Sequence, residues 1–293
     1  MKPGVLNLDK PAGETSFAMV RRLRALTGAK RVGHAGTLDP LATGVLPILF
    51  ESATRLTDFA HALPKTYLAD IHLGFRSNTD DAEGEEEAGG DPSHLTEADV
   101  AAALGEFVGR IRQRPPAFSA VKIDGQRSYR LAREGEPVEP AEREVVIHSA
   151  RLLRFEPGPR AVAGVEVVCG SGTYLRALAR DLGARLSVGG LLGRLVRSAY
   201  GPLGLAQAWS LDRLPDPAAV EAALLGPEVL LAGMARVRLN VEQEAMVRQG
   251  RSVRVLPEPP AGSVRAHATD GRLVAVGHTD PLRRTFVPEK VFS

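Results

Sequence analysis

Cysteine is almost absent from the sequence, since Cys169 is the only one. A single thiol cannot form an internal disulfide or a cysteine zinc knuckle. The seven histidines are scattered along the chain, with no His-Glu-x-x-His motif and no closely spaced pair. These shortages exclude disulfide-stapled and zinc-knuckle proteins, and we expect neither a structural metal nor a metal cofactor.

Long hydrophobic runs are also missing. The N-terminal stretch MKPGVLNLDKPAGETS contains no apolar run of signal-peptide length, and no later segment reaches the roughly 18 apolar residues of a membrane span. We therefore expect a cytoplasmic protein with no membrane partner. The rest of the composition is that of a globular protein, because 44% of the 293 residues are hydrophobic and 25% are charged. This length predicts one large domain and one small one.

The net charge is only +2, but the charges are unevenly distributed. Acidic residues bunch between Asp80 and Asp91, whereas arginines are spread through the expected helices and the C-terminal part. Outside the acidic segment the chain is therefore basic, which favours a polyanion such as nucleic acid as a partner. Arginine suits phosphate and base recognition better than lysine does. A GC-rich genome produces the same excess of arginine, so composition alone leaves the partner open.

The spacing of apolar residues predicts a mixture of strands and helices. A strand over residues 5–8 precedes a helix capped by Thr15 or Ser16 and stopped at Gly28. The outer face of this helix and the segment after it are basic, which a solvated surface explains as readily as a binding role does. These basic residues are Arg21, Arg22, Arg24, Lys30 and Arg31.

Further along, alternating side chains predict a strand over residues 65–75, and an acidic loop follows it. A helix capped by Thr96 is expected next, with its apolar face formed by Val100, Leu104, Phe107 and Val108. Strands are expected over 145–155 and 162–169, then a helix over 173–186. The C-terminal residues 236–293 alternate short strands with glycine turns, as a small β-barrel does.

The most constrained stretch is GHAGTLDPLATGVLP, residues 33–47. Asp39 precedes a proline, which holds it in a non-helical backbone conformation. Glycines at 33, 36 and 44 permit positive φ values and the close approach of another molecule. Asp-Pro alone is a common turn starter, but His34 and Thr37 add hydrogen-bonding groups nearby. From the residues, the stretch predicts a site with one carboxylate.

This stretch resembles the active-site motif of the TruB family of tRNA pseudouridine synthases. LDKP at residues 8–11, KTY at 65–67 and SGTYLRALARDLG at 171–183 occur in the order found in that family. The resemblance covers nearly the whole chain. It implies an α+β fold, with a pseudouridine synthase catalytic domain over 1–232 built on a mixed, largely antiparallel sheet flanked by helices. A PUA-like β-barrel is implied over 236–293.

The resemblance also implies a reaction and a partner. The reaction is isomerisation of uridine to pseudouridine at position 55 in the T loop of tRNA, with the base flipped into a pocket. It consumes no electrons, phosphate or water, so no cofactor is expected. The T stem-loop, and the acceptor stem through the C-terminal domain, would be bound by a monomer that needs no protein partner.

The resemblance also implies roles for individual residues. The resemblance makes Asp39 the catalytic carboxylate, pairs Arg176 with it and stacks Tyr67 on the flipped base. Without the resemblance, Arg176 would be interpreted as a helix-face arginine bound to Asp181 or to solvent, and Tyr67 as a core residue of a strand. The implied substrate-binding residues are His34, Thr37, Lys65, Tyr174, Leu192 and Lys10. Leu192 lies in LLGRLVRSAY, which departs from the family pattern at Gly193.

A basic arm over residues 112–143 resembles the thumb-like insertion that closes over RNA in this family. A long arm of this composition is more typical of a binding loop than of a connection. Its expected contacts with the RNA backbone come from Arg112, Arg114, Lys122, Arg127 and Arg130, together with Arg133.

Three alternatives remain at this stage. A guide-RNA-dependent pseudouridine synthase subunit shares the aspartate motif and the PUA-like domain, although the arm favours a stand-alone enzyme. A tRNA-binding folding chaperone with secondary catalysis would share the basic surface. A nucleotide-binding enzyme could use residues 170–172, Gly-Ser-Gly, at a helix N-terminus, but the spacing fits neither a P-loop nor a dinucleotide fingerprint.

Overall fold

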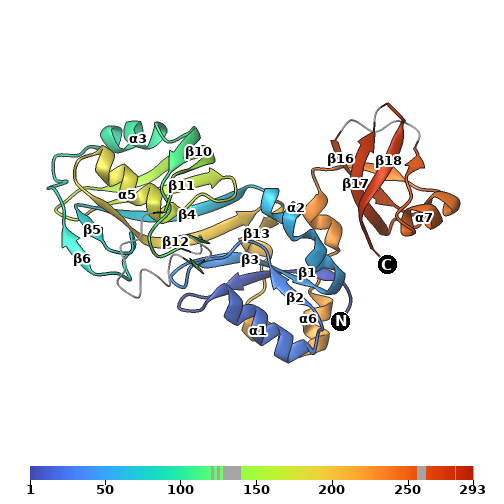
Figure 1. Ribbon diagram of the computed structural model, residues 1–293. Helices are drawn as coiled ribbons and strands as arrows, with labels where there is room; N and C mark the ends of the chain where they lie inside the picture. Colours follow the sequence, from blue (N-terminus) through green and yellow to red (C-terminus); the bar gives the residue numbers. More distant parts are fainter. Residues whose placement is uncertain (120–121, 124–125, 128–139, 256–261, 281, 293) are drawn as a thin grey trace.

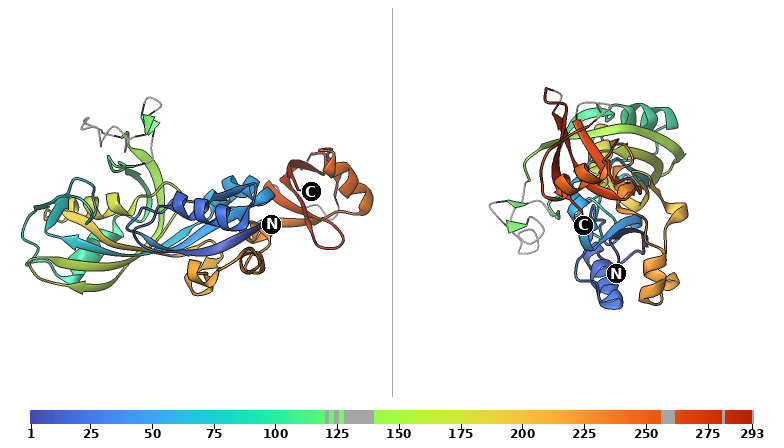
Figure 2. Two further views of the ribbon diagram at one scale, coloured as in Figure 1. Left: turned by 90° about the horizontal axis from the view of Figure 1, so that it is seen from below. Right: turned by 90° about the vertical axis from the view of Figure 1, so that its right-hand side faces the viewer.

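The computed structural model describes residues 1–119, 122–123, 126–127, 140–255, 262–280 and 282–292. Its described part contains one large mixed sheet with helices packed on it and a smaller sheet that lies at one end of the molecule (Figures 1 and 2). The fold is α+β, as the sequence predicts. No helix in the described ranges is long and apolar enough to cross a membrane.

The large sheet has the strand order β1-β3-β12-β4-β11-β10-β7, with β2 paired to β3 and β13 to β12. Only the short β3–β12 pairing is parallel, so the sheet is mixed and largely antiparallel, as expected. Its strands are β1 (Gly4–Lys10), β2 (Val32–His34), β3 (Thr43–Phe50), β4 (Lys65–Leu73), β7 (Gly109–Gln113), β10 (Arg143–Glu156), β11 (Ala161–Cys169), β12 (Gly190–Tyr200) and β13 (Leu203–Gly204).

The alternation predicted for the central strand β4 is present. Tyr67, Ala69, Ile71 and Leu73 are buried on one face of the sheet, whereas Leu68 is exposed on the other. Successive side chains of a strand point to opposite faces, so this register decides which side chains can meet in a site. The face that carries Tyr67 is the one covered by the main hydrophobic core.

The helices pack on the sheet through the apolar faces seen in their sequences. α1 (Ser16–Thr27) is capped by Thr15 and buries Met19, Val20 and Leu23. α5 (Leu175–Arg185) packs on β12 and β4, and α3 (Glu97–Gly105) packs on β10. Within the described ranges, the other helical segments are η1 (Glu51–Leu56), α2 (Thr57–Ala62), η2 (Leu205–Gln207), η3 (Leu211–Arg213), α6 (Pro217–Ala222), η4 (Pro227–Leu231) and α7 (Val241–Arg248).

Two expectations about local structure were wrong. α3 ends at Gly105, so Phe107 and Val108 are not on its apolar face, and Val108 is exposed. The acidic segment is not a plain loop, because β5 (Phe75–Ser77) and β6 (Glu86–Ala88) pair across it. This pairing brings the residues between the two strands back toward β12, where the Ala82 N–H donates to the Leu192 carbonyl at 2.9 Å.

The C-terminal strands form a five-stranded sheet in the order β14-β16-β17-β18-β15, consistent with a PUA-like unit. These strands are β14 (Ala235–Arg238), β15 (Val253–Arg254), β16 (Gly262–His267), β17 (Leu273–Asp280) and β18 (Thr285–Val291). The helix α7, capped by Asn240, was not expected from the sequence. Buried Val276 and Phe292 share a hydrophobic cluster with residues of β3 and η1, so this sheet is packed against the larger one.

Candidate active site

The backbone on either side of Asp39 is held by side chains and backbone groups from the start of the chain. The Ser16 hydroxyl, buried at the start of α1, accepts a hydrogen bond from the Leu38 N–H at 2.8 Å and donates to the Leu38 carbonyl at 3.1 Å. On the other side, the Gly13 N–H donates to the Pro40 carbonyl at 2.8 Å. Because both neighbours are fixed, the Asp39 side chain leaves the backbone in a defined direction.

Lys10 also holds the backbone around this turn. Its ammonium is fully buried and donates to the carbonyls of Pro11, Glu14 and Pro40 at 2.8, 2.7 and 3.3 Å. Burial lowers the pKa of Lys10 to about 8, although the nearby Asp39 carboxylate opposes this shift. Three carbonyls use all three donors of an ammonium, so Lys10 contacts the chain rather than open space.

Two of the three glycines in the motif are required by its geometry. Gly36 and Gly44 have positive φ values of 70° and 99°, whereas Gly33 does not. A Cβ atom at Gly44 would lie 2.3 Å from the carbonyl oxygen of Arg197, and one at Gly36 would lie 2.9 Å from the Tyr200 ring. Only glycine tolerates both the backbone conformation and the contact, so the motif is packed directly against β12.

The structure brings Arg176 and Asp39 together. Arg176 Nε lies 2.9 Å from Asp39 Oδ2, and since the N–H is not aligned for a hydrogen bond, the contact is an ion pair. The remaining nitrogens donate to the carbonyls of Thr79 and Phe118, both at 3.0 Å, and Nη1 lies 3.5 Å from Asp81 Oδ2. The Arg176 and Asp81 side chains are 6% and 5% exposed, whereas that of Asp39 is 35% exposed. Only the Asp39 carboxylate is therefore open to a bound molecule.

The alternative pairing of Arg176 with Asp181 is not found. Asp181 instead accepts from Arg180 Nε at 2.9 Å, and Arg180 Nη1 donates to Asp80 at 2.9 Å. Burial raises the pKa of both Asp80 and Asp181, and the Arg180 guanidinium opposes the rise. Arg176 is thus left to the carboxylates of Asp39 and Asp81.

Sequence reasoning missed Asp80 and Asp81. They belong to the segment that the sequence predicts to be an acidic loop, but Asp81 is buried and both pair with arginines of α5. The available signal was the adjacent pair of acids shortly after β5, combined with two arginines four residues apart on a predicted helix. Pairing them required the β5–β6 turn, which local periodicity does not reveal.

A second buried arginine, Arg197 of β12, lies beside Tyr67. Its Nε donates to the Val45 carbonyl at 2.6 Å and Nη2 to the Gly36 carbonyl at 2.9 Å, and Nη1 lies 3.5 Å from the Tyr67 hydroxyl. The guanidinium also lies 5.1 Å from the centre of the Tyr200 ring. Burial raises the pKa of Tyr67, partly offset by Arg197. Arg197 therefore joins β3, β4 and the loop that leads to Asp39.

Lys65, at the start of β4, is buried near the same cluster. Its ammonium donates to the His61 carbonyl and to the Ser171 hydroxyl, both at 2.7 Å, and lies 4.8 Å from the centre of the Tyr200 ring. Burial lowers the pKa of Lys65 to about 8, with a smaller contribution from Arg197. Like the ammonium of Lys10, that of Lys65 is hydrogen-bonded to other groups of the protein.

The remaining expected binding residues lie around this centre. His34 is half-buried at the end of β2, its Nδ1 has no hydrogen-bond partner among the described residues, and burial lowers its pKa. Thr37 is exposed. Tyr174 stands just before α5, where its N–H donates to the Gln113 side chain at 2.9 Å and its carbonyl accepts from it at 3.1 Å. The Arg143 guanidinium lies 4.7 Å from the centre of the Tyr174 ring.

Leu192 lies in the interior of the sheet, on β12. It is fully buried opposite Ile71 on β4, and its backbone bonds to residues 80 and 82. Leu195, which is also buried, lies opposite Ala69 and therefore nearer to Tyr67 in the sheet register. The departure from the family pattern at Gly193 coincides with an irregularity in the pairing of β12 between Leu192 and Arg194.

The expected RNA contacts fall at the edge of the described residues. Arg112 and Arg114 are exposed and lie 3.4 and 3.7 Å from the Glu142 carboxylate. Lys122 and Arg127 belong to the paired strands β8 (Lys122–Ile123) and β9 (Gln126–Arg127). Arg130 and Arg133 lie outside the described residues.

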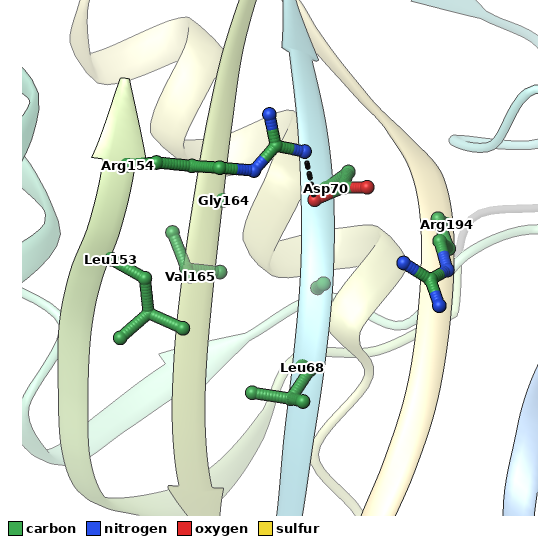
Figure 3. A pocket seen from close by; sticks show the side chains of 8 residues that line it. Leu68, Asp70, Leu153, Arg154, Gly164, Val165 and Arg194 are labelled. Atoms are coloured by element: carbon green, nitrogen blue, oxygen red, sulfur yellow. Dashed lines mark hydrogen bonds and ion pairs between the residues drawn. The ribbon is translucent and has the colours of Figure 1, made fainter. Parts of the chain in front are cut away.

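A shallow pocket lies away from this centre, on the opposite face of the sheet (Figure 3). Leu68 and Asp70 line it, and they alternate with Tyr67 along β4. Arg154 crosses it to bond Asp70 at 2.9 Å, and Arg194 stands at its edge (Figure 3). Among the described residues no group of three or more His, Cys, Asp or Glu side chains could hold a metal ion.

Comparison with solved structures identifies the fold. The chain resembles a chain in the crystal structure of a Cbf5-Nop10-Gar1 complex with a TM-score of 0.75 and 25% identity, over 99% of this chain and 84% of that one. Residues 24–175 match the model of the TruB family pseudouridylate synthase N-terminal domain. The fold and this match place the chain in the class of pseudouridine synthases, the isomerases that make pseudouridine from uridine.

Relatives named tRNA pseudouridine synthase B show to which family of this class the chain belongs. The protein of a Synechococcus species is 46% identical over 94% of this chain and 93% of its own length. That of Symbiobacterium thermophilum is 49% identical over 84% of this chain and 82% of its own length. The chain belongs to the TruB family.

Proposed function

We propose that this protein converts uridine to pseudouridine at position 55 in the T loop of tRNA, without a cofactor and with Asp39 as the catalytic carboxylate. The names of its relatives support tRNA as the substrate. The observation that carries the proposal is the ion pair between the part-exposed Asp39 and the buried Arg176, on a turn whose backbone is fixed on both sides.

The proposed chemistry is balanced without a co-reactant. The bond between N1 of uracil and C1′ of the ribose breaks, the base turns, and a bond forms between C5 and C1′. The hydrogen on C5 leaves as a proton and N1 gains one, so nothing is oxidised or reduced. A single carboxylate can serve by bonding to the ribose, by bonding to the uracil ring or by removing a ribose proton, and each role needs an ionised Asp39.

Arg176 supplies the counter-charge for that ionised form. An arginine whose other nitrogens are satisfied by carbonyls keeps a fixed position, so it stabilises the carboxylate without moving during the reaction. Tyr67, whose hydroxyl lies 3.5 Å from Arg197 Nη1, would supply the aromatic ring on which a flipped base stacks.

The other residues have proposed roles that follow their positions. His34, Thr37 and Tyr174 surround the site and would contact the nucleotide or its neighbours. The ammonium groups of Lys10 and Lys65 are bonded to the chain itself, and Leu192 lies fully buried in β12, so we assign these three to supporting the pocket walls rather than to direct contact. The arm would bind phosphates through its basic residues, which are Arg112, Arg114, Lys122, Arg127 and Arg130.

The proposed domain division is a catalytic domain over 1–232, with the thumb-like insertion about 112–143, and a PUA-like domain over 236–293 that touches the acceptor side. A monomer working in the cytoplasm without a protein partner completes the proposal. A guide-RNA-dependent subunit is the second candidate, because the similar solved chain was crystallised with Nop10 and Gar1.

Incubating the purified protein alone with a transcribed tRNA and with a T-arm stem-loop tests both candidates. We expect pseudouridine at position 55 in each RNA, located by chemical modification and primer extension, and none in a control tRNA that carries cytidine at this position. Product only after a guide RNA or partner proteins are added would instead support the second candidate. Product at other positions would contradict the assigned target.

A chaperone role is separated by the Asp39→Asn variant. A chaperone with secondary catalysis would still promote tRNA folding in this variant at the wild-type rate, as measured by structure probing. Folding promoted only by the active enzyme would tie the effect to the modification.

A further inference from the structure

We propose that the exposed face of α1 and the basic segment after it form a second RNA-binding surface, in which Phe17 stacks on an unpaired base and Arg21 and Arg24 bind phosphates. This inference rests on the proposed function and adds a contact outside the pocket. The surface, called here the α1 surface, consists of Phe17, Arg21, Arg24, Lys30 and Arg31.

Phe17 is unusual for its exposure. Its side chain is 69% exposed in the first turn of α1, although Met19, Val20 and Leu23 of the same helix are buried. Exposed single hydrophobic residues are common and need no explanation by themselves. An aromatic ring beside unpaired cations is a different case, because it provides the π-face on which single-stranded bases stack.

Arg21 and Arg24 share the face of Phe17. They follow it by four and seven residues, a spacing that places side chains above one another on a helix. Both are exposed, and neither has an ion-pair partner in the described part of the chain. Arg22, on a different face, is bound to Glu14 at 2.5 Å. The two arginines that follow Phe17 along this face of the helix are thus available to an external anion.

The charge of the whole segment is of one sign. Residues 16–34 contain five basic residues and no acidic one. Lys30 and Arg31 are exposed, and within the described ranges neither side chain has an ion-pair partner. They lead directly into β2, which packs beside α1 and ends at His34 (Figure 1). An uncompensated basic strip with an aromatic ring is complementary to RNA and not to a neutral or basic protein.

The start of α1 lies next to the turn that carries Asp39. Ser16, the residue before Phe17, holds Leu38 by two hydrogen bonds, and Leu38 precedes Asp39. A nucleotide bound at Asp39 therefore has neighbours along its strand within reach of the start of α1. These contacts assign the surface to the RNA that flanks the target uridine.

Equilibrium binding of labelled full-length tRNA to the Asp39→Asn protein tests the proposal without turnover. We expect Phe17→Ala and Phe17→Leu to weaken binding by roughly 5- to 100-fold and Phe17→Trp to retain it, because only an aromatic face stacks. Arg21→Gln combined with Arg24→Gln should lower the slope of log Kd against log salt by about two. In the active enzyme, KM should rise while kcat at saturating tRNA stays unchanged.

Matched controls come from the opposite face of the sheet. Leu153→Ala removes an exposed apolar side chain there, and Arg194→Gln removes an exposed arginine at the edge of the pocket in Figure 3. Neither change should alter tRNA affinity. Melting curves of each variant identify any that lost helix α1 rather than a contact, and a variant at position 17 that melts early is replaced by Phe17→Gln.

The outcomes separate this inference from the proposed function. If the wild-type protein modifies tRNA but the α1 variants bind it with unchanged Kd and salt slope, the inference is overturned alone. Retention of affinity in Phe17→Leu with loss in Phe17→Ala would also overturn it, because that pattern indicates an apolar contact without stacking. If the Asp39→Asn protein does not bind tRNA at all, the inference fails together with the proposed substrate.

Discussion

At the residue scale, two buried arginines organise the candidate site from opposite sides. Arg176 faces the carboxylates of Asp39 and Asp81, whereas Arg197 faces the carbonyls of Val45 and Gly36. A buried guanidinium is tolerated only when its donors are matched by acceptors. Arg176 therefore pairs with the candidate catalytic carboxylate of Asp39, and Arg197 fixes the backbone of the loop that carries it.

Replacing Arg197 with methionine tests this second role. The change removes two hydrogen bonds from a charged donor and leaves buried carbonyls without partners, so we expect the free energy of unfolding to fall by roughly 2–4 kcal/mol. Urea denaturation measures the change. Arg194→Met, at an exposed position of the same strand, should alter it by no more than about 0.5 kcal/mol. An equal loss of unfolding free energy in both variants would mean that the hydrogen bonds from Arg197 to the Val45 and Gly36 carbonyls do not stabilise the fold.

Lys65 predicts a pH dependence of stability. Burial lowers its pKa to about 8 from 10.5, so between these pH values the unfolded chain holds a proton that the folded chain has lost. The free energy of unfolding therefore rises with pH over this window, and the cost of burying the charge is fully present below pH about 8. Relative to Lys65→Met, the wild type should gain roughly 1.5 kcal/mol between pH 8 and 9.5.

Chemical denaturation at several pH values gives this difference, in which the similar contribution of Lys10 cancels. Tyr67, with its raised pKa, acts only above pH about 10 and lies outside the window. A constant difference between the two proteins across the range would show that Lys65 keeps its ordinary pKa.

At the scale of elements, the turn that carries Asp39 depends on its packing against β12. Asp-Pro and the glycines predict a constrained turn from sequence, and the structure contains one. The turn is held by hydrogen bonds from Ser16 to Leu38 and from Arg197 to Gly36. These bonds could not be predicted from the sequence, because they join residues that only the tertiary fold brings together.

Gly44→Ala tests that packing. The φ of 99° at Gly44 disfavours any side chain, and the new Cβ atom would lie 2.3 Å from the Arg197 carbonyl oxygen. We expect a loss of at least about 3 kcal/mol in the free energy of unfolding. Gly105→Ala, at the last residue of α3 with open space around it, should be neutral or stabilise by about 0.5–1 kcal/mol. Comparable losses in both would contradict the close approach at Gly44.

The base of the arm is another element that the sequence only partly indicates. Its composition predicts a binding loop and the family resemblance implies that it binds RNA, but its lack of periodicity hides how it is anchored. Gln113 bonds Tyr174 in both directions, and the Phe118 carbonyl accepts from Arg176. The arm therefore begins on the same residues that hold the candidate catalytic carboxylate, which offers a path from RNA binding to the site.

At the scale of the whole molecule, local patterns predicted most of the helices and strands, and the family resemblance implied the class of fold. The local patterns did not predict the order of the strands in the sheet. The alternation in β4 and the capped helices α1 and α3 were readable because they depend on neighbours in sequence. The parallel contact of β3 with β12 and the shared cluster around Phe292 join distant segments, and no local signal encodes them.

The overall charge pattern predicts a strong salt dependence of tRNA binding. The acids at 80 and 81 are neutralised by arginines of α5, while the arm and the α1 surface remain basic. Affinity should fall by roughly an order of magnitude or more between about 50 and 200 mM salt. Filter binding across this range measures the slope, and a flat response would exclude phosphate contacts as the main source of affinity.

The most direct test of the whole account is tritium release from C5-labelled uridine in a T-arm stem-loop. The purified protein should release tritium, Asp39→Asn should be slower by roughly a thousandfold or more, and Asp70→Asn, on the opposite face of the sheet, should retain most activity. Wild-type release that persists in Asp39→Asn would contradict the assignment of the catalytic carboxylate, and no release by any of the three would contradict the proposed reaction on this RNA.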